Sequence, residues 1–213
     1  MAEIIFAMDI DDLGQAREWV EELAPEINFF KIGLQLFTLY GPEAVKIVQA
    51  RGKNVFLDLK INDIPNTCAK ATEAAAKLGC YSLTIHISAG EEALKSSVSG
   101  REDAKPHLWG VTILSSIGTG NSLERARIAK DCGLDGVIVS GDDVETVRSN
   151  FSDLELVVPG IRPADSNTDD QKRVLTPKEA VEKGADFLVI GRPIRNSSDP
   201  LKLVRQIKTE INS

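Results

Sequence analysis

Two short stretches of the sequence decide the fold: DCGLDGVIV at residues 131–139 and EKGADFLVI at residues 182–190. Each has the polar end of a helix, then a glycine, then a short apolar run. Glycine commonly follows the last turn of a helix because it adopts a left-handed backbone without strain. A short apolar run after such a turn is typical of a buried strand. Each stretch therefore predicts a helix, a tight turn and a strand, and KLGC at residues 77–80 begins a third copy.

The same unit recurs along the whole chain. Apolar runs with little polar alternation occur at residues 4–8, 29–33, 55–59, 82–87, 108–114, 136–139, 156–159 and 187–190. Strands buried on both faces of a parallel sheet have this composition. Stretches with helix signals lie between them, at residues 12–23, 42–51, 66–78, 91–98, 123–132, 144–149, 177–183 and 200–211. Eight strand–helix units predict an α/β fold, a (β/α)8 TIM barrel forming a single domain over residues 1–213. An open doubly wound sheet, which usually has fewer strands, is the alternative.

Composition limits the partners of the protein. The net charge is −7 and no basic cluster is visible, so we expect neither nucleic-acid nor membrane binding. The N-terminus lacks the pattern of a secretory signal, and no apolar stretch has the length of a membrane span. Cys68, Cys80 and Cys132 match no zinc or redox spacing, and His86 and His107 are too far apart for a typical zinc site. These features predict a cytoplasmic protein with reduced thiols and no metal site.

Polar residues recur where the predicted strands end. In a TIM barrel the C-terminal ends of the strands form the rim that carries the active site. Loops that begin at strand ends would explain one or two charges there, but not two lysines and two aspartates within otherwise apolar segments. The rim residues are Asp9, Lys31, Asp58, Lys60, His86, Thr112, Ser115, Ser140, Pro159, Arg162, Gly191 and Arg192.

The segment FLDLKINDIPNT, residues 56–67, is the most informative of these strand ends. Asp58 and Lys60 are two residues apart on a strand and are therefore expected on the same face. Asp63 follows at the turn into the next helix. Nearby carboxylates favour the protonated form of a lysine, which suits Lys60 to donate a proton to a carbanion. A structural salt bridge at the barrel mouth explains the spacing equally well.

Two further segments predict phosphate binding. VIGRPI at residues 189–194 puts Gly191 and Arg192 after the eighth strand, where many of these barrels bind a phosphate, although a surface arginine after a turn glycine is the simpler alternative. The long polar stretch at residues 159–177 carries Arg162, Gln171, Lys172 and Arg173. Long loops at a barrel rim are commonly lids, and we expect a lid here rather than a tolerated insertion.

Six motifs in this order resemble the bacterial type of orotidine 5′-monophosphate decarboxylase. The resemblance extends from Asp9 to about Pro200. The spacing of Asp58, Lys60 and Asp63 alone is shared with a wider suprafamily, whereas the segments DIPNT, DDQKRV and GRPI in this order are much more specific. One position departs from the family, since Asn62 stands where histidine is frequent. The motifs are AMDI (7–10), FKIG (30–33), DLKINDIPNT (58–67), PGIRP (159–163), DDQKRV (169–174) and VIGRPI (189–194).

The resemblance implies a homodimer of barrels that acts without metal or cofactor on orotidine 5′-monophosphate. It implies a charged network of Lys31, Asp58, Lys60 and, from the partner subunit, Asp63. Asp58 would lie beside the departing carboxylate, and Lys60 would stabilise and then protonate the carbanion at C6.

The resemblance also implies the remaining substrate contacts. Asp9 and Lys31 would bind the ribose, and Ser115 and the backbone near Pro159 would bind the pyrimidine. Thr67 would reach the ligand from the partner subunit, and Ile64 would also contact the substrate. The phosphate would be held by Arg162, Gln171, Gly191 and Arg192.

Two other functions compete with this one. A metal-dependent sugar-phosphate decarboxylase or aldolase of the same suprafamily needs a carboxylate cluster for magnesium, usually with an acidic residue from the second strand. Here that strand ends in Lys31, whose charge would repel the metal. A non-catalytic phosphate-binding barrel is the second rival, and the complete charged quartet argues against it.

Overall fold

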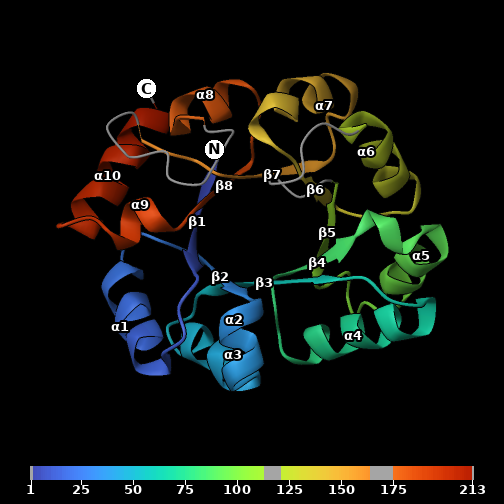
Figure 1. The fold of residues 1–213 in the computed structure, drawn as a ribbon, viewed down its shortest axis with the longest axis horizontal. Helices are drawn as coiled ribbons and strands as arrows, with labels where there is room; N and C mark the ends of the chain where they lie inside the picture. Colours follow the sequence, from blue (N-terminus) through green and yellow to red (C-terminus); the bar gives the residue numbers. More distant parts are fainter. Residues whose placement is uncertain (1, 113–120, 164–174, 213) are drawn as a thin grey trace.

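The computed structural model describes residues 2–112, 121–163 and 175–212. Eight parallel strands close into a barrel in chain order, with β1 paired to both β2 and β8, and helices surround it (Figure 1). This confirms the predicted TIM barrel. The strands are β1 (Glu3–Met8), β2 (Phe29–Gly33), β3 (Asn54–Ile61), β4 (Ser82–His86), β5 (His107–Val111), β6 (Gly136–Ile138), β7 (Glu155–Pro159) and β8 (Phe187–Ile190).

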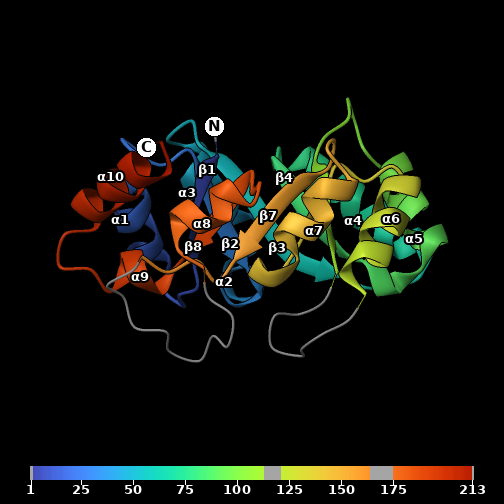
Figure 2. The same cartoon turned by 90° about the horizontal axis from the view of Figure 1, so that it is seen from above.

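The helices include two that the sequence did not predict, α2 and α9, which directly follow β2 and β8 (Figure 2). Both are short and lack a side-chain cap at the N-terminus, and the signals they do carry, Gly41 after α2 and Pro193 in the first turn of α9, are equally typical of turns. The helices are α1 (Leu13–Leu23), α2 (Leu34–Tyr40), α3 (Pro42–Gln49), α4 (Pro65–Lys77), α5 (Glu91–Ser99), α6 (Ser122–Asp131), α7 (Val144–Asn150), α8 (Pro177–Glu182), α9 (Arg192–Arg195) and α10 (Pro200–Ile211), with short 3-10 turns η1 (Ile87–Ala89) and η2 (Gly141–Asp143).

The glycine turns predicted from the opening motifs are present. Gly133 and Gly184 have φ of +83° and +100°, the left-handed region in which a side chain is strained. Gly184 is also constrained by packing, because an added Cβ would lie 2.6 Å from Cγ of Arg148. These positions end the helices abruptly and send the chain back into the sheet.

Several strand boundaries differ from the predicted ones, most of them by a single residue. β3 extends to Ile61, beyond the expected end at residue 59, and β4 ends at His86 because the next residues form η1. β5 ends at Val111 rather than at residue 114, and residues 113–120 lie outside the described part of the chain. The extension of β3 matters most, since it includes Lys60.

Both faces of the strands are buried, which explains the lack of alternation in the sequence. Outward side chains such as Phe6 pack under the helices, whereas inward ones fill the barrel. Phe56 and Trp109 meet inside it with ring centroids 4.6 Å apart. These inward-facing side chains pack together inside the barrel, below the C-terminal rim. They are Ile5, Ala7, Phe29, Phe56, Trp109, Val157, Phe187 and Val189.

The cysteines and the lengths of the helices are two remaining features that the sequence analysis considered. The three cysteines are buried free thiols. None of the described helices is long and apolar enough to cross a membrane.

Candidate active site

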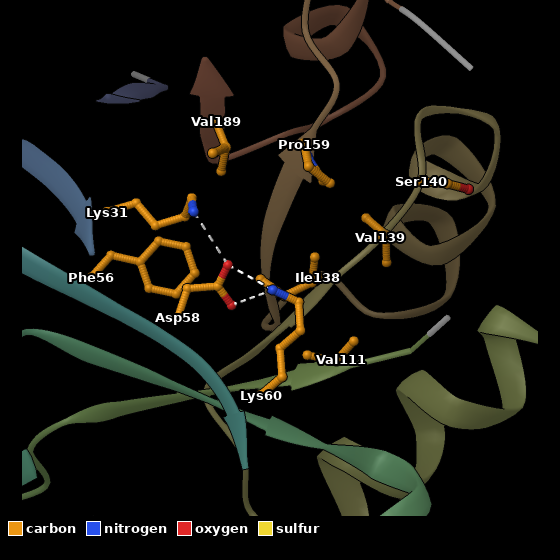
Figure 3. Close-up of a pocket in the computed structure, with 10 residues that line it drawn as sticks. All are labelled: Lys31, Phe56, Asp58, Lys60, Val111, Ile138, Val139, Ser140, Pro159 and Val189. Atoms are coloured by element: carbon orange, nitrogen blue, oxygen red, sulfur yellow. Dashed lines mark hydrogen bonds and ion pairs between the residues drawn. The ribbon is translucent and has the colours of Figure 1, made fainter. Parts of the chain in front are cut away.

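Four charged side chains from the first three strands meet at the C-terminal rim. Lys31 Nζ lies 2.7 Å from Oδ1 of Asp9 and 3.6 Å from Oδ2 of Asp58. Lys60 Nζ donates to both oxygens of Asp58, at 2.8 and 2.7 Å. Figure 3 shows both ammonium groups directed at the Asp58 carboxylate. The structure thus brings together Asp9, Lys31, Asp58 and Lys60 as an alternating row of charges.

The Asp58 carboxylate is buried yet ionised. Burial by itself would raise the pKa of Asp58, because a charge is poorly solvated in the interior. The charges of Lys31 and Lys60 and the hydrogen bonds from Lys60 and Thr84 outweigh this effect and hold the pKa below its ordinary value. The site therefore maintains a fixed negative charge between two cations.

The backbone at Lys60 departs from the regular strand that the sequence predicted. Its φ is +49°, and the pairing of β3 with β4 shifts between Leu57 and Ile61. Alternation along an ideal strand is therefore not what points Lys60 at Asp58. A bulge re-aims the side chain, as bulges beside active sites commonly do.

Thr84 is a polar residue of the site that the sequence analysis missed. It lies on β4 and is completely buried. Its hydroxyl accepts a hydrogen bond from Lys60 N at 2.8 Å and donates one to Asp58 Oδ1 at 2.9 Å. A threonine inside an apolar strand is indistinguishable in the sequence from the β-branched residues that fill a core. Only the pairing of β3 with β4, which places Thr84 opposite Asp58 and Lys60, identifies it as part of the site.

Apolar side chains form the opposite wall of the pocket that contains Lys31, Asp58 and Lys60 (Figure 3). Charges act more strongly beside such a wall than in water, because the local dielectric constant is lower. A bound ligand would lie between the row of charged side chains and the apolar wall. The wall consists of Val111, Ile138, Val139, Pro159 and Val189, and Phe56 and Ser140 complete the lining.

The residues predicted to bind phosphate lie elsewhere on the rim. Gly191 precedes α9, where an added Cβ would lie 3.2 Å from Cβ of Ala7 and 3.8 Å from Oδ2 of Asp9. Arg192 is the half-buried first residue of α9. Arg162 is buried, and its Nη1 donates to the Ile161 carbonyl at 3.0 Å. Backbone close packing at Gly191 thus brings β8 against the Asp9 side of the charged row.

Asp63, Ile64 and Thr67 are not among the described residues that line this pocket. Asp63 and Thr67 are exposed, Ile64 is 66% exposed, and Asp63 Oδ1 accepts a hydrogen bond from Ile64 N. Ser115, Gln171 and residues 164–174 of the predicted lid lie outside the described residues. His86, at the end of β4, exchanges a hydrogen bond with the Ser88 hydroxyl, at 2.6 Å from its Nδ1.

Comparisons with known proteins identify the family of this chain. Residues 2–207 match the model of the orotidine 5′-phosphate decarboxylase / HUMPS family. An orotidine 5′-phosphate decarboxylase of Dictyoglomus thermophilum is 41% identical, over 98% of this chain and 94% of that protein. One from Vibrio cholerae is 39% identical, over 98% of each. The crystal structure of the Lactobacillus acidophilus orotidine 5′-phosphate decarboxylase superposes with a TM-score of 0.87 at 34% identity, covering 100% of both chains. The chain therefore belongs to the orotidine 5′-phosphate decarboxylase / HUMPS family.

Proposed function

We propose that this protein is a carboxy-lyase that converts orotidine 5′-monophosphate to UMP and CO2. One observation carries the proposal: the Lys60 ammonium group is bonded to both oxygens of a buried, ionised Asp58 at the mouth of an apolar pocket. The family membership and the names of the relatives support the same activity.

The geometry suits the loss of a carboxylate from an aromatic ring. A substrate carboxylate beside Asp58 would feel repulsion from that fixed charge, and the repulsion disappears when CO2 leaves. As the carbon–carbon bond breaks, its electron pair stays on C6 of the pyrimidine. Lys60 stabilises this carbanion and transfers a proton to it, which leaves a neutral amine that water reprotonates. Interactions that grow stronger in the transition state are the ones that accelerate a reaction.

The order of groups around the rim matches the order of parts in a nucleotide. Gly191, beside the proposed phosphate site, is next to Asp9, which binds Lys31. Lys31 in turn approaches Asp58, and Asp58 holds Lys60. Phosphate at Gly191 and Arg192, ribose at Asp9 and Lys31, and pyrimidine at Asp58 and Lys60 would follow this row in sequence. Arg162, Gln171, Pro159 and Ser115 would add the contacts that the resemblance implies.

We further propose a homodimer with shared active sites. Asp63, Ile64 and Thr67 lie between the end of β3 and the first turn of α4, where they are exposed and do not line the pocket of their own chain. The exposed Ile64 side chain would be covered by a second copy. In such a dimer Asp63 of each chain completes the partner's Lys–Asp–Lys row, and two-fold contacts are the commonest form of oligomer.

We expect the reaction to need neither metal nor cofactor. Asp9 and Asp58 both form ion pairs with Lys31, whose charge opposes a divalent cation. Within residues 2–112, 121–163 and 175–212, no three His, Cys, Asp or Glu side chains come together as a metal site. The buried free thiols also favour a cytoplasmic location.

The direct test is turnover of orotidine 5′-monophosphate with and without EDTA. We expect UMP and CO2 to form at the same rate in both. Turnover that EDTA removes and Mg²⁺ restores would contradict the metal-free mechanism, and absence of turnover would leave the metal-dependent sugar-phosphate enzyme as the alternative. Tight binding of UMP without turnover would favour the non-catalytic barrel.

Arg192→Ala tests the phosphate contact. Binding energy from the phosphate, remote from the reacting carbon, is available to orient the ring, so its loss should lower kcat/KM for the nucleotide by about 10²-fold. Orotidine, which lacks the phosphate, should lose much less. Arg205→Ala on α10, an exposed arginine whose Nε donates to Glu26 Oε1 at 2.8 Å, is the matched control. Equal losses for both substrates would contradict the assignment.

A further inference from the structure

We propose that Thr84 is a positioning residue, which holds Lys60 in the place from which it transfers its proton to the substrate. The proposal rests on the proposed function. Thr84 is assigned no role by the motifs, since it lies outside all of them. Its proposed role follows instead from the way β3 pairs with β4.

The pairing of β3 with β4 leaves Thr84 opposite a bulge. Leu57 pairs with Leu83 and Ile61 pairs with Ile85, so the three residues Asp58 to Lys60 stand opposite Thr84 alone. Backbone groups in such a bulge lose their ladder partners. The Thr84 side chain replaces one of them, because its hydroxyl accepts from Lys60 N at 2.8 Å.

The same hydroxyl also fixes the acidic partner of Lys60. Because Lys60 N–H can only donate, the hydroxyl proton is left for another acceptor, and Asp58 Oδ1 lies 2.9 Å away. Lys60 Nζ closes the loop by donating to Asp58 Oδ1 and Oδ2. One buried hydroxyl therefore ties the backbone of Lys60 to the carboxylate that its own ammonium group binds.

The backbone conformation of Lys60 needs a contact that stabilises it. Its φ of +49° is sparsely populated by residues with a side chain, and it persists only where the surroundings enforce it. Threonine suits this purpose, since its β-branch restricts χ1 and its burial excludes water as a competing partner. Without the hydroxyl, Lys60 would be free to relax toward an ordinary strand conformation and move its ammonium group.

Thr84→Val tests the inference, because valine keeps the shape and removes both hydrogen bonds. We expect kcat to fall by about 10²-fold with KM changed much less, since a displacement of about 1 Å costs this much. We also expect the acid limb of the kcat profile to move to higher pH. The Thr84 hydrogen bond lowers the pKa of Asp58, so its removal raises that pKa. Thr84→Ser, which keeps the hydroxyl, should recover most of kcat and the original acid limb.

Thr72→Val is the matched control. Thr72 is equally buried, and its hydroxyl donates to the Cys68 carbonyl at 3.0 Å within α4. A general effect of losing a buried hydroxyl would lower kcat in both variants, whereas a positioning role predicts the loss in Thr84→Val only. If Thr84→Val does not fold, Thr84→Ala against Thr84→Ser makes the same comparison, because both lack the methyl group.

Two outcomes would overturn the inference. One is Thr84→Val turning over within about twofold of the wild type with an unmoved acid limb. The other is a crystal structure of the variant in which Lys60 keeps its left-handed backbone and its bonds to Asp58. The crystal structure needs no substrate, so it distinguishes failure of this inference from failure of the proposed function, which the wild-type enzyme alone decides.

Discussion

Lys60→Ala is expected to reduce turnover of orotidine 5′-monophosphate by at least about 10²–10⁴-fold, because it removes both the acid and the cation that faces the developing carbanion. Lys60 is the residue bonded to both oxygens of Asp58. Its side chain is 33% exposed and outside the core, so the barrel should still form. Single-turnover assays by ultraviolet absorbance and circular dichroism on the same sample would measure both effects.

The control is Lys46→Ala on α3, an exposed lysine that pairs with Glu43 and is not one of the residues that line the pocket of Asp58 and Lys60. It should retain full activity. Nucleotide affinity should change far less than kcat in Lys60→Ala, since the phosphate and ribose contacts remain. Near-normal kcat in Lys60→Ala would reject it as the proton donor and would leave the Asp58–Lys60 contact as a structural salt bridge.

Mixing two inactive variants should restore activity if the sites are shared between subunits. Lys60→Ala and Asp63→Ala each damage every site of their own homodimers. A mixed dimer has one site with both defects and one site with neither. After random exchange of equal amounts about half of the dimers are mixed, so roughly a quarter of all sites should recover. Activity measured against time after mixing would follow the exchange.

A second mixture provides the control. Asp58 and Lys60 face the same pocket of one chain, so mixing Asp58→Ala with Lys60→Ala leaves one defect in every site and should restore nothing. Differently tagged chains would verify the exchange in both mixtures. Absence of recovery in the first mixture after proven exchange would mean that Asp63 acts within its own subunit, which contradicts the shared-site dimer.

Local sequence patterns determined most of the fold. Glycine turns such as Gly133 and Gly184 separate helices from strands through local conformation alone, because only glycine adopts the left-handed backbone freely. Runs without alternation predicted strands covered on both faces, and two buried layers are present. The first three strand ends also predicted that Asp9, Lys31, Asp58 and Lys60 would meet, because neighbouring parallel strands end at the same edge. The roles of these residues in catalysis stay predictions.

Long-range pairing decided the rest. The sequence contains no signal for the bulge in β3, since its cause is the register of Leu57 and Ile61 against β4, and register depends on residues that are distant along the chain. The left-handed Lys60 backbone and the buried Thr84 hydroxyl follow from that register. In the same way, only the closed barrel separates Asp58 and Lys60, which face the pocket, from the nearby Asp63, which is exposed. A spacing along the chain cannot tell inward from outward once the strand is irregular, because the alternation on which it relies is lost there.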